Sequence, residues 1–239
     1  VGYGQEKLIG DKVFYSTGFD EEYNLMYAWA GIDGESGSPI LSHRINNIFA
    51  YDGTYMFYTG YDKKSSKNIV GRYNINTDKD YTLYSYSDVG NVGNIVGISM
   101  SDKKIYSVTM TKEPENYDDR TAEYRIEVRD GKKGKLLNTL PFVLTGAANY
   151  GFLFEGDSLI YSTADSICKI DVNTGTEGKV LARFNELEYW GLPHFVPGDG
   201  YVYYETLADL DPDTGFNDYF YRVSLDGGEP ELLNAWYTG

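Results

Sequence analysis

A short pattern occurs five times along this 239-residue chain and strongly limits the folds open to it. In each copy, a turn that contains aspartate is followed by an apolar stretch with a tyrosine near its centre. The copies lie at 10–16, 52–59, 101–107, 156–162 and 198–204, and their tyrosines are Tyr15, Tyr58, Tyr106, Tyr161 and Tyr203. Repeats spaced at about 40 to 50 residues are typical of architectures in which each repeat is one structural unit.

Each repeat divides into four strand-like segments. The first segments are 7–9, 47–50, 95–98, 150–154 and 192–196, and each precedes the turn and tyrosine stretch that forms the second segment. The third segments are 25–29, 69–73, 124–128, 167–171 and 219–223, and the fourth are 39–41, 81–84, 136–138, 180–182 and 231–233. Short runs of Gly, Asn and Asp join the third segments to the fourth, as hairpin turns require.

Four strands are the content of one propeller blade. No part of the chain shows the sustained 3.6-residue period of a long amphipathic helix. The sequence therefore predicts an all-β fold, a five-bladed β-propeller of four-stranded antiparallel blades. We expect a single domain over 1–239, with blades at about 4–43, 45–87, 92–142, 147–186 and 189–236.

Two runs in the later repeats resemble repeats of known propeller families. They are Lys169-Ile170-Asp171-Val172-Asn173-Thr174-Gly175 and Tyr221-Arg222-Val223-Ser224-Leu225-Asp226-Gly227-Gly228. With the tyrosine strands before them, they resemble TolB-type and low-density-lipoprotein-receptor-related propeller repeats, and the resemblance covers essentially the whole chain. It implies an extracytoplasmic protein, secreted or anchored at the surface of a bacterium, that binds a partner rather than catalysing a reaction. The motif marks the blade and transfers no functional residues.

The links between strands differ in length on the two faces of such a propeller. Links from first to second and from third to fourth strands leave one face, here named the short-turn face, as tight turns. The other links leave the opposite, long-loop face at 19–24, 61–68, 86–94, 111–123, 142–149, 184–189 and 205–218. Long loops cost ordering entropy and frequently carry function. We therefore expect the binding surface on the long-loop face, the alternative being neutral drift in loops that tolerate insertion.

Charge narrows the class of partner. The formal net charge is −15, and acidic residues concentrate in the long links. Affinity for nucleic acid or an anionic membrane rests on Lys and Arg, so neither is expected as a partner. No apolar run is long enough to span a bilayer, so we expect no direct membrane insertion. The single cysteine, Cys168, excludes an internal disulfide.

Amide and aromatic side chains occur where the chain enters the first strands. They are Gln5, Asn47, Asn94, Asn149, Tyr150, Tyr189 and Trp190, with His194 within a first strand. Such groups can hydrogen-bond and stack on a neutral polar ligand, such as a sugar or a peptide. The alternative is that the amides satisfy backbone groups at the strand entries and that the histidine packs.

One acidic link is a candidate cation site. Asp209, Asp211 and Asp213 alternate along the chain, and carboxylate oxygens are the ligands that calcium prefers. The run departs from the EF-hand loop at Thr214, where glycine is expected, and at Phe220, where a bidentate glutamate is expected. The alternative is an acidic, solvated hairpin loop, and no other cofactor is indicated.

Catalytic motifs are weak in this sequence. Five-bladed glycosidases place carboxylates in the central channel, and the clear carboxylates near the first strands are Glu6 and Glu155. We therefore expect a non-enzymatic, monomeric binding module for a protein, peptide or glycan. The alternatives are a glycoside hydrolase-like enzyme that uses channel carboxylates and a structural spacer of a larger surface protein.

Overall fold

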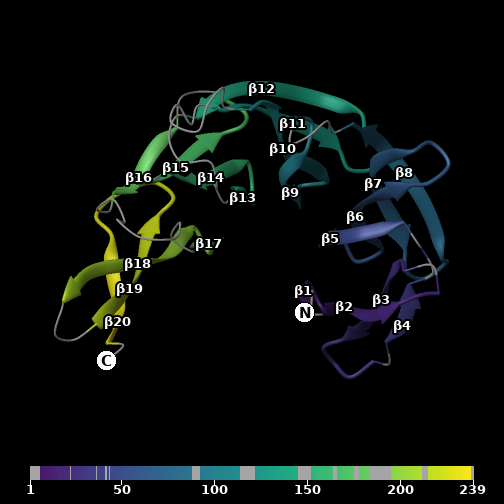
Figure 1. Cartoon of the computed structure of the whole chain (residues 1–239), viewed down its shortest axis with the longest axis horizontal. Coiled ribbons are helices and arrows are strands. Elements are labelled where there is room, and N and C mark those ends of the chain that lie inside the picture. Colours follow the sequence, from purple (N-terminus) through teal and green to yellow (C-terminus); the bar gives the residue numbers. More distant parts are fainter. Residues whose placement is uncertain are drawn as a thin grey trace. The chain divides into compact units, whose positions relative to one another are not determined.

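The structure, a computed structural model, describes most of the chain. The described residues are 6–21, 23–35, 37–40, 42, 44–87, 92–113, 122–144, 152–163, 166–174, 178–183, 195–211 and 215–237. Every regular element in these ranges is a β-strand, and the strands form five four-stranded antiparallel sheets (Figure 1). The predicted all-β, five-bladed propeller is therefore confirmed. The described ranges hold no helix of the length and apolarity that crossing a membrane requires.

Each blade consists of four consecutive strands. The first contains β1 (Lys7–Ile9), β2 (Lys12–Phe19), β3 (Leu25–Gly31) and β4 (Ser38–Ile40), and the second β5 (Ile45–Tyr51), β6 (Tyr55–Asp62), β7 (Lys67–Asn74) and β8 (Lys79–Tyr86). The third contains β9 (Ile95–Ser101), β10 (Lys104–Lys112), β11 (Ala122–Asp130) and β12 (Leu136–Leu144). The fourth contains β13 (Phe152–Glu155), β14 (Ser158–Ser162), β15 (Ser166–Asp171) and β16 (Lys179–Arg183). The fifth contains β17 (Phe195–Gly198), β18 (Tyr201–Asp211), β19 (Gly215–Ser224) and β20 (Glu231–Tyr237).

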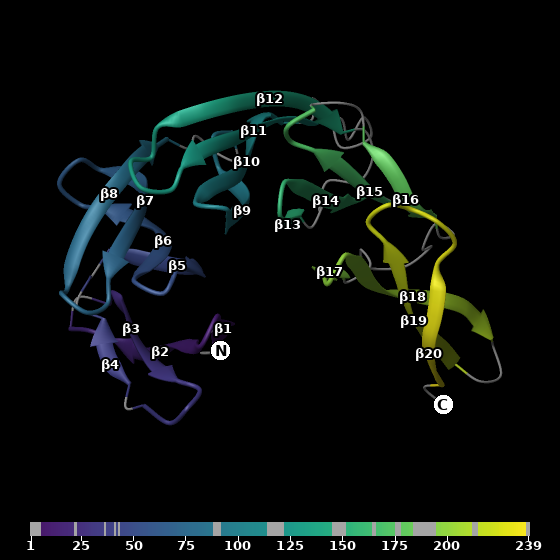
Figure 2. The same ribbon diagram turned by 180° about the vertical axis from the view of Figure 1, so that it is seen from behind.

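The chain forms two compact units. Unit 1 comprises Val1–Asn94 with Asp130–Lys135, and unit 2 comprises Ile95–Arg129 with Leu136–Gly239. Within unit 1, β1 lies beside β5. Within unit 2, β13 lies between β9 and β17, as the front and back views show (Figures 1 and 2). The first strands of neighbouring blades in a unit are therefore adjacent, and the fourth strands form the outer edges of the sheets.

The apolar cores lie between the facing sheets of neighbouring blades. In unit 1, one cluster joins blades one and two around Phe14, Ile48, Met56, Tyr58 and Tyr73. In unit 2, one cluster centres on Tyr106, Tyr124, Ile126, Phe152 and Tyr161, and another on Ile160, Ile167, Phe195, Val202 and Tyr204. Alternation along the strands produces this arrangement, because every second side chain points to the same face of a sheet.

The repeated tyrosine is not equivalent in all five blades. Tyr161 pairs with Phe152, whereas Tyr204, and not Tyr203, pairs with the corresponding Phe195. Tyr204 is buried and Tyr203 is only half-buried. A shift of one residue turns a strand side chain to the other face of the sheet. The sequence pattern therefore located the strand in blade five, but Tyr203 does not occupy the register position that Tyr161 occupies in blade four.

Two of the predicted long links are shorter than expected. Most of 205–218 is an extended hairpin, in which β18 and β19 pair from Tyr201↔Ser224 to Ala208↔Asn217 and again at Asp211↔Gly215. In 61–68, β6 and β7 pair as far as Asp62↔Lys67. Continued pairing satisfies backbone hydrogen-bonding groups that an irregular loop would leave to water. The prediction of long irregular loops was wrong for these two segments.

Candidate functional site

A pocket of about 510 Å³ opens in unit 1. Its lining residues are Asp20, Glu21, Asn24, Arg44, Tyr61, Asp62, Lys63 and Lys64. They come from the β2–β3 link, the β4–β5 link and the segment from the end of β6 into the β6–β7 turn. All three connections belong to the long-loop face. The volume falls within the range of small-ligand pockets, roughly 300–1,000 Å³.

The β2–β3 link is held by its own hydrogen bonds. The backbone N–H and the side-chain amide of Asn24 both donate to the Asp20 carboxylate, at 2.8 Å each. The Tyr23 N–H donates to the Asp20 carbonyl at 3.0 Å, and Tyr23 has a left-handed backbone with φ 62°. This closed turn places exposed Glu21 at the edge of the pocket.

The β6–β7 turn is capped in a similar way. The Asp62 carboxylate accepts a hydrogen bond from the Ser65 hydroxyl at 2.7 Å and another from the Lys64 N–H at 3.3 Å. The hydrogen bond from Ser65 is the main reason that the pKa of Asp62 is lowered. The turn therefore carries an ionised Asp62 beside two exposed lysines, Lys63 and Lys64.

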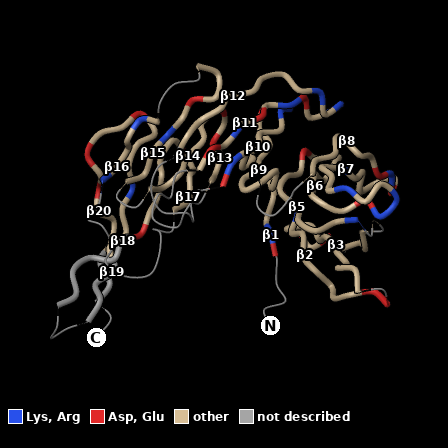
Figure 3. The backbone as a smooth tube through the Cα atoms, turned by 45° about the horizontal axis from the view of Figure 1, so that its top comes forward, with Lys and Arg blue, Asp and Glu red and all other residues tan. Residues whose placement is uncertain are grey.

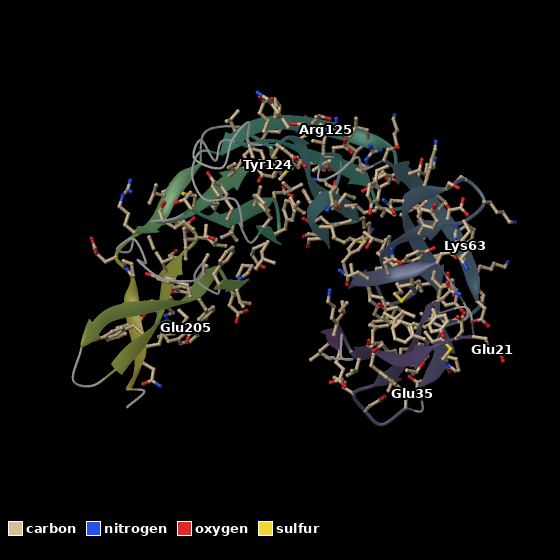
Figure 4. The ribbon with its side chains drawn as sticks, in the orientation of Figure 1. Glu21, Glu35, Lys63, Tyr124, Arg125 and Glu205 are labelled. Atoms are coloured by element: carbon tan, nitrogen blue, oxygen red, sulfur yellow. The ribbon has the colours of Figure 1, made fainter. Side chains whose placement is uncertain are left out.

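Acidic and basic residues thus share one part of unit 1. Around β7 and β8, red and blue segments lie close together along the tube (Figure 3). Glu21 from the first blade and Lys63 from the second lie on the same side of the unit (Figure 4). The acids in this region were expected from the sequence, whereas the bases facing them were not.

Arg44 in the β4–β5 link is fixed by several contacts. Its guanidinium forms an ion pair with Asp80 at 2.9 Å, and donates to the Tyr58 hydroxyl at 3.1 Å and to the Thr82 hydroxyl at 3.0 Å. Asp80 also accepts hydrogen bonds from the Tyr58 hydroxyl at 2.6 Å and from the Ser42 hydroxyl at 2.8 Å. Two strands of the second blade, β6 and β8, therefore set the position of this side chain.

The backbone of Arg44 is also fixed, through a close approach to β6. Its carbonyl accepts a hydrogen bond from the Tyr61 N–H at 3.0 Å. A Cβ atom on Gly60 would lie 1.6 Å from that carbonyl oxygen, which no real structure tolerates. The absence of a side chain at Gly60 therefore allows Arg44 to occupy its place in the pocket.

Protonation states follow from these surroundings. Burial lowers the pKa of Arg44, but the nearby Tyr58 and Asp80 outweigh burial and raise it overall. Burial and then the Asp80 hydrogen bond raise the pKa of Tyr58 far above its ordinary value of 10. The guanidinium stays charged and the phenol stays neutral near pH 7.

Of the predicted strand-entry residues, the structure describes Asn47 and Asn94. Asn47 lies on β5, where its side-chain oxygen accepts a hydrogen bond from the Lys7 ammonium at 3.0 Å, and Lys7 also donates to the Ile48 carbonyl at 2.9 Å. The Asn47 amide thus has a structural contact between β1 and β5. Asn94 is exposed immediately before β9. The other predicted residues lie outside the described ranges, namely Gln5, Asn149, Tyr150, Tyr189, Trp190 and His194.

For the predicted cation and catalytic carboxylates, the structure gives only the places of single residues along the chain. The backbones of Asp209 and Asp211 belong to β18, and Asp213 lies outside the described ranges. Within those ranges, no group of three or more His, Cys, Asp or Glu residues is placed to hold a metal ion. Calcium binding stays a prediction. Glu6 precedes β1 in unit 1, and Glu155 ends β13 in unit 2.

Comparisons with known proteins show the fold. No family model and no curated protein matches the chain. Among solved structures, acylaminoacyl peptidase from Pyrococcus horikoshii aligns with a TM-score of 0.66 and 13% identity over 98% of this chain and 39% of its own. Oligogalacturonate lyase in complex with manganese aligns with a TM-score of 0.67 and 14% identity over 98% of this chain and 66% of its own.

A third solved structure is the β-propeller domain of the trilobed protease from Pyrococcus furiosus. It has a TM-score of 0.58 and 10% identity over 97% of this chain and 71% of that one. The chain thus spans less than two thirds of the length of the peptidase and about two thirds of that of the lyase. At these identities the similarity shows a shared propeller fold, and membership of the TolB-type family stays a prediction.

Proposed function

We propose that this chain is a non-enzymatic, extracytoplasmic binding module that takes up a peptide, a glycan or a segment of a protein in the pocket of unit 1. The observation that carries the proposal is the convergence of three links of the long-loop face on one pocket of about 510 Å³. Loops positioned by a rigid scaffold are where binding residues concentrate.

The pocket is organised before any ligand arrives. Hydrogen bonds close the turn at Asp20, the turn at Asp62 is capped by Ser65, and Arg44 is fixed by Asp80 and Tyr58. A site whose groups are already ordered loses less entropy on binding. Tyr61 adds a ring that is 43% exposed, which can pack on an apolar or sugar surface.

The test begins with two ligand collections, a glycan array and a random peptide display library. The dissociation constants of the selected ligands are then measured for the wild type and for Tyr61→Ala and Lys64→Gln. We expect each substitution to weaken binding about fivefold or more, because each removes a direct contact.

Lys132→Gln is the matched control. Lys132 is also an exposed turn lysine, but it lies in the β11–β12 turn of the short-turn face. Its replacement should change the dissociation constant less than twofold. Equal losses for Lys64→Gln and Lys132→Gln would reject the assignment of binding to the pocket, and selection of no ligand from either library would favour a spacer.

A further inference from the structure

Blades two and five carry an arginine at the same place in their sheets. Arg72 on β7 lies opposite Tyr81 on β8, and Arg222 on β19 lies opposite Glu231 on β20. In both sheets the register between the third and fourth strands shifts between the second and the first residue before the arginine. The two arginines therefore occupy equivalent positions, and their surroundings can be compared directly.

The arginine of blade five has a carboxylate partner. The Arg222 guanidinium lies over the ring of Tyr201, 4.7 Å from its centroid. Its Nε donates to Glu231 Oε2 at 2.8 Å, and its Nη2 lies 2.7 Å from the same oxygen. The ring face attracts the cation, and the carboxylate supplies the opposite charge.

The arginine of blade two has the rings but no carboxylate. The Arg72 guanidinium lies 4.3 Å from the ring centroid of Tyr55 and 5.3 Å from that of Tyr81. Within the part of the chain that the structure describes, no residue forms a hydrogen bond or an ion pair with Arg72. Its Nε is buried without an acceptor, whereas neither Nη group is buried in this way. The two Nη groups are therefore open to solvent and free to bind an anion.

The acidic residues nearest to Tyr81 along β8 have partners of their own. Asp80 forms the ion pair with Arg44 described above, and its side chain points to the opposite face of the strand from Tyr81. The Asp78 carboxylate accepts a hydrogen bond from the Tyr73 hydroxyl at 2.7 Å. Neither carboxylate neutralises Arg72.

We infer that Arg72, Tyr55 and Tyr81 form a second binding site, which takes the carboxylate of a glutamate or aspartate side chain on a partner protein segment. The partner carboxylate would do for Arg72 what Glu231 does for Arg222. The planar fork of a guanidinium matches a carboxylate, and such charge-assisted hydrogen bonds are about twice as strong as neutral ones. This site goes beyond the pocket of the proposed function.

The surroundings of Arg72 suit a segment with one acidic side chain. Tyr81 is exposed, so its ring can pack on the aliphatic part of that side chain. Lys79 is also exposed and lies on the same face of β8, two residues before Tyr81, where it adds positive charge. The net charge of −15 disfavours a segment that carries many acids, because the whole protein would repel it.

The test is an NMR titration of the full chain with the blocked tripeptide acetyl-Gly-Glu-Gly-amide, followed through the Nε–Hε signal of Arg72. We expect this signal to shift in a saturable way. The matched acetyl-Gly-Gln-Gly-amide should bind about fivefold more weakly or worse, because it lacks the charge. Sodium acetate provides a free carboxylate and should also bind more weakly, because it has no aliphatic chain to pack on Tyr81.

Four variants assign the site. Arg72→Gln should abolish binding of the glutamate peptide, and Arg222→Gln, the matched control with the same change of charge, should leave it unchanged. Tyr81→Glu places a carboxylate at the position equivalent to Glu231, so it should abolish binding without lowering the melting temperature. Glu231→Ala should free Arg222 and add a second, similar site, seen as a shift of the Arg222 Nε–Hε signal.

The outcomes separate this inference from the proposed function. Equal losses in Arg72→Gln and Arg222→Gln, or a glutamine peptide that binds as tightly as the glutamate peptide, would overturn the site. Acetate that binds as tightly as the peptide would reduce the site to one for any small carboxylate and overturn the partner segment. The pocket variants Tyr61→Ala and Lys64→Gln should not change these titrations. Losses in them instead of in Arg72→Gln would place the peptide in the pocket and overturn the second site alone.

Discussion

Tyr106 and Asp157 bring together the two residue types that recur in every repeat. The Tyr106 hydroxyl donates to the Asp157 carboxylate, which also accepts a hydrogen bond from the Asn173 amide. The equivalent turn residue Asp52 does something else, since it accepts hydrogen bonds from the backbone N–H groups of Thr54 and Tyr55. At the scale of single residues, recurrence in the sequence therefore shows a shared place in the turn and not a shared contact.

The first prediction concerns the hydroxyl of Tyr106. Tyr106→Phe removes a hydrogen bond to a carboxylate from a fully buried side chain, so we expect the free energy of unfolding to fall by about 1–3 kcal/mol. Urea unfolding measures the change. Tyr15→Phe is the control, because Tyr15 is only half-buried, and its effect should be smaller. Equal losses in the two variants would contradict the role given to the Tyr106–Asp157 contact.

The second prediction concerns high pH. Burial, and next the neighbouring Tyr221, raise the pKa of Tyr204 from 10 to about 12. Between pH 10 and 12 the unfolded chain has lost this proton and the folded chain keeps it, so stability falls as the pH rises. The contribution of Tyr204 is fully present below pH 10 and is on the order of 2 kcal/mol.

Tyr204→Phe provides the check. This variant cannot ionise at the position, so its unfolding free energy should fall less steeply between pH 10 and 12 than that of the wild type. Denaturant unfolding at a series of pH values measures both slopes, and identical slopes would contradict the assignment.

At the scale of elements, the close contact between the β4–β5 link and β6 connects the fold to the pocket. The third prediction is that Gly60→Ala lowers the free energy of unfolding by more than about 1 kcal/mol, because the new Cβ would clash with the Arg44 carbonyl. The same substitution should weaken ligand binding, since Arg44 would have to move.

Gly198→Ala is the control for that clash. Gly198 ends β17, and a Cβ atom built there meets nothing within 4 Å. We expect it to change stability and binding much less than Gly60→Ala. Unfolding curves and dissociation constants are measured for both variants. If Gly60→Ala changed neither stability nor binding more than Gly198→Ala does, the close contact at Gly60 would be contradicted.

Strand positions were predictable from the sequence because alternation and turn residues are local signals. The turns between third and fourth strands show this, since Asp130 and Asp171 cap theirs through side-chain hydrogen bonds to backbone N–H groups two and three residues later. The length of the β18–β19 hairpin was not predictable, because a polar segment can either continue the paired strands or form an irregular loop. That outcome depends on pairing across the sheet.

The pocket was predictable only in part. Asp20, Glu21 and Asp62 were expected on the long-loop face as acids. The place of Arg44 depends on Gly60 and on Asp80, residues that are 16 and 36 positions away along the chain. A sequence pattern does not reveal such pairs, although Arg44 immediately before a first strand and the Lys63-Lys64 pair in an acidic link were visible signals.

At the scale of the whole molecule, the acidic balance affects both stability and binding. A net charge of −15 creates self-repulsion in the compact state, which salt screens. The fourth prediction is that raising sodium chloride from about 0.02 M to about 0.5 M raises the melting temperature, as scanning calorimetry would measure. The rise should be smaller near pH 4.5, the isoelectric point, where the net charge is close to zero. A fall in melting temperature at neutral pH would contradict the prediction.

The proposed binding of a ligand in the pocket of unit 1, on the long-loop face, can be tested residue by residue. The most direct measurement is a map of backbone amide chemical shifts by NMR, recorded as a selected ligand is added to the full chain. Binding in the pocket should cause the largest changes at 20–24, at Arg44 and at 61–64, and should leave the turns at 32–35 and 130–135 unaffected. Changes that concentrate in those two turns and spare the pocket would contradict it.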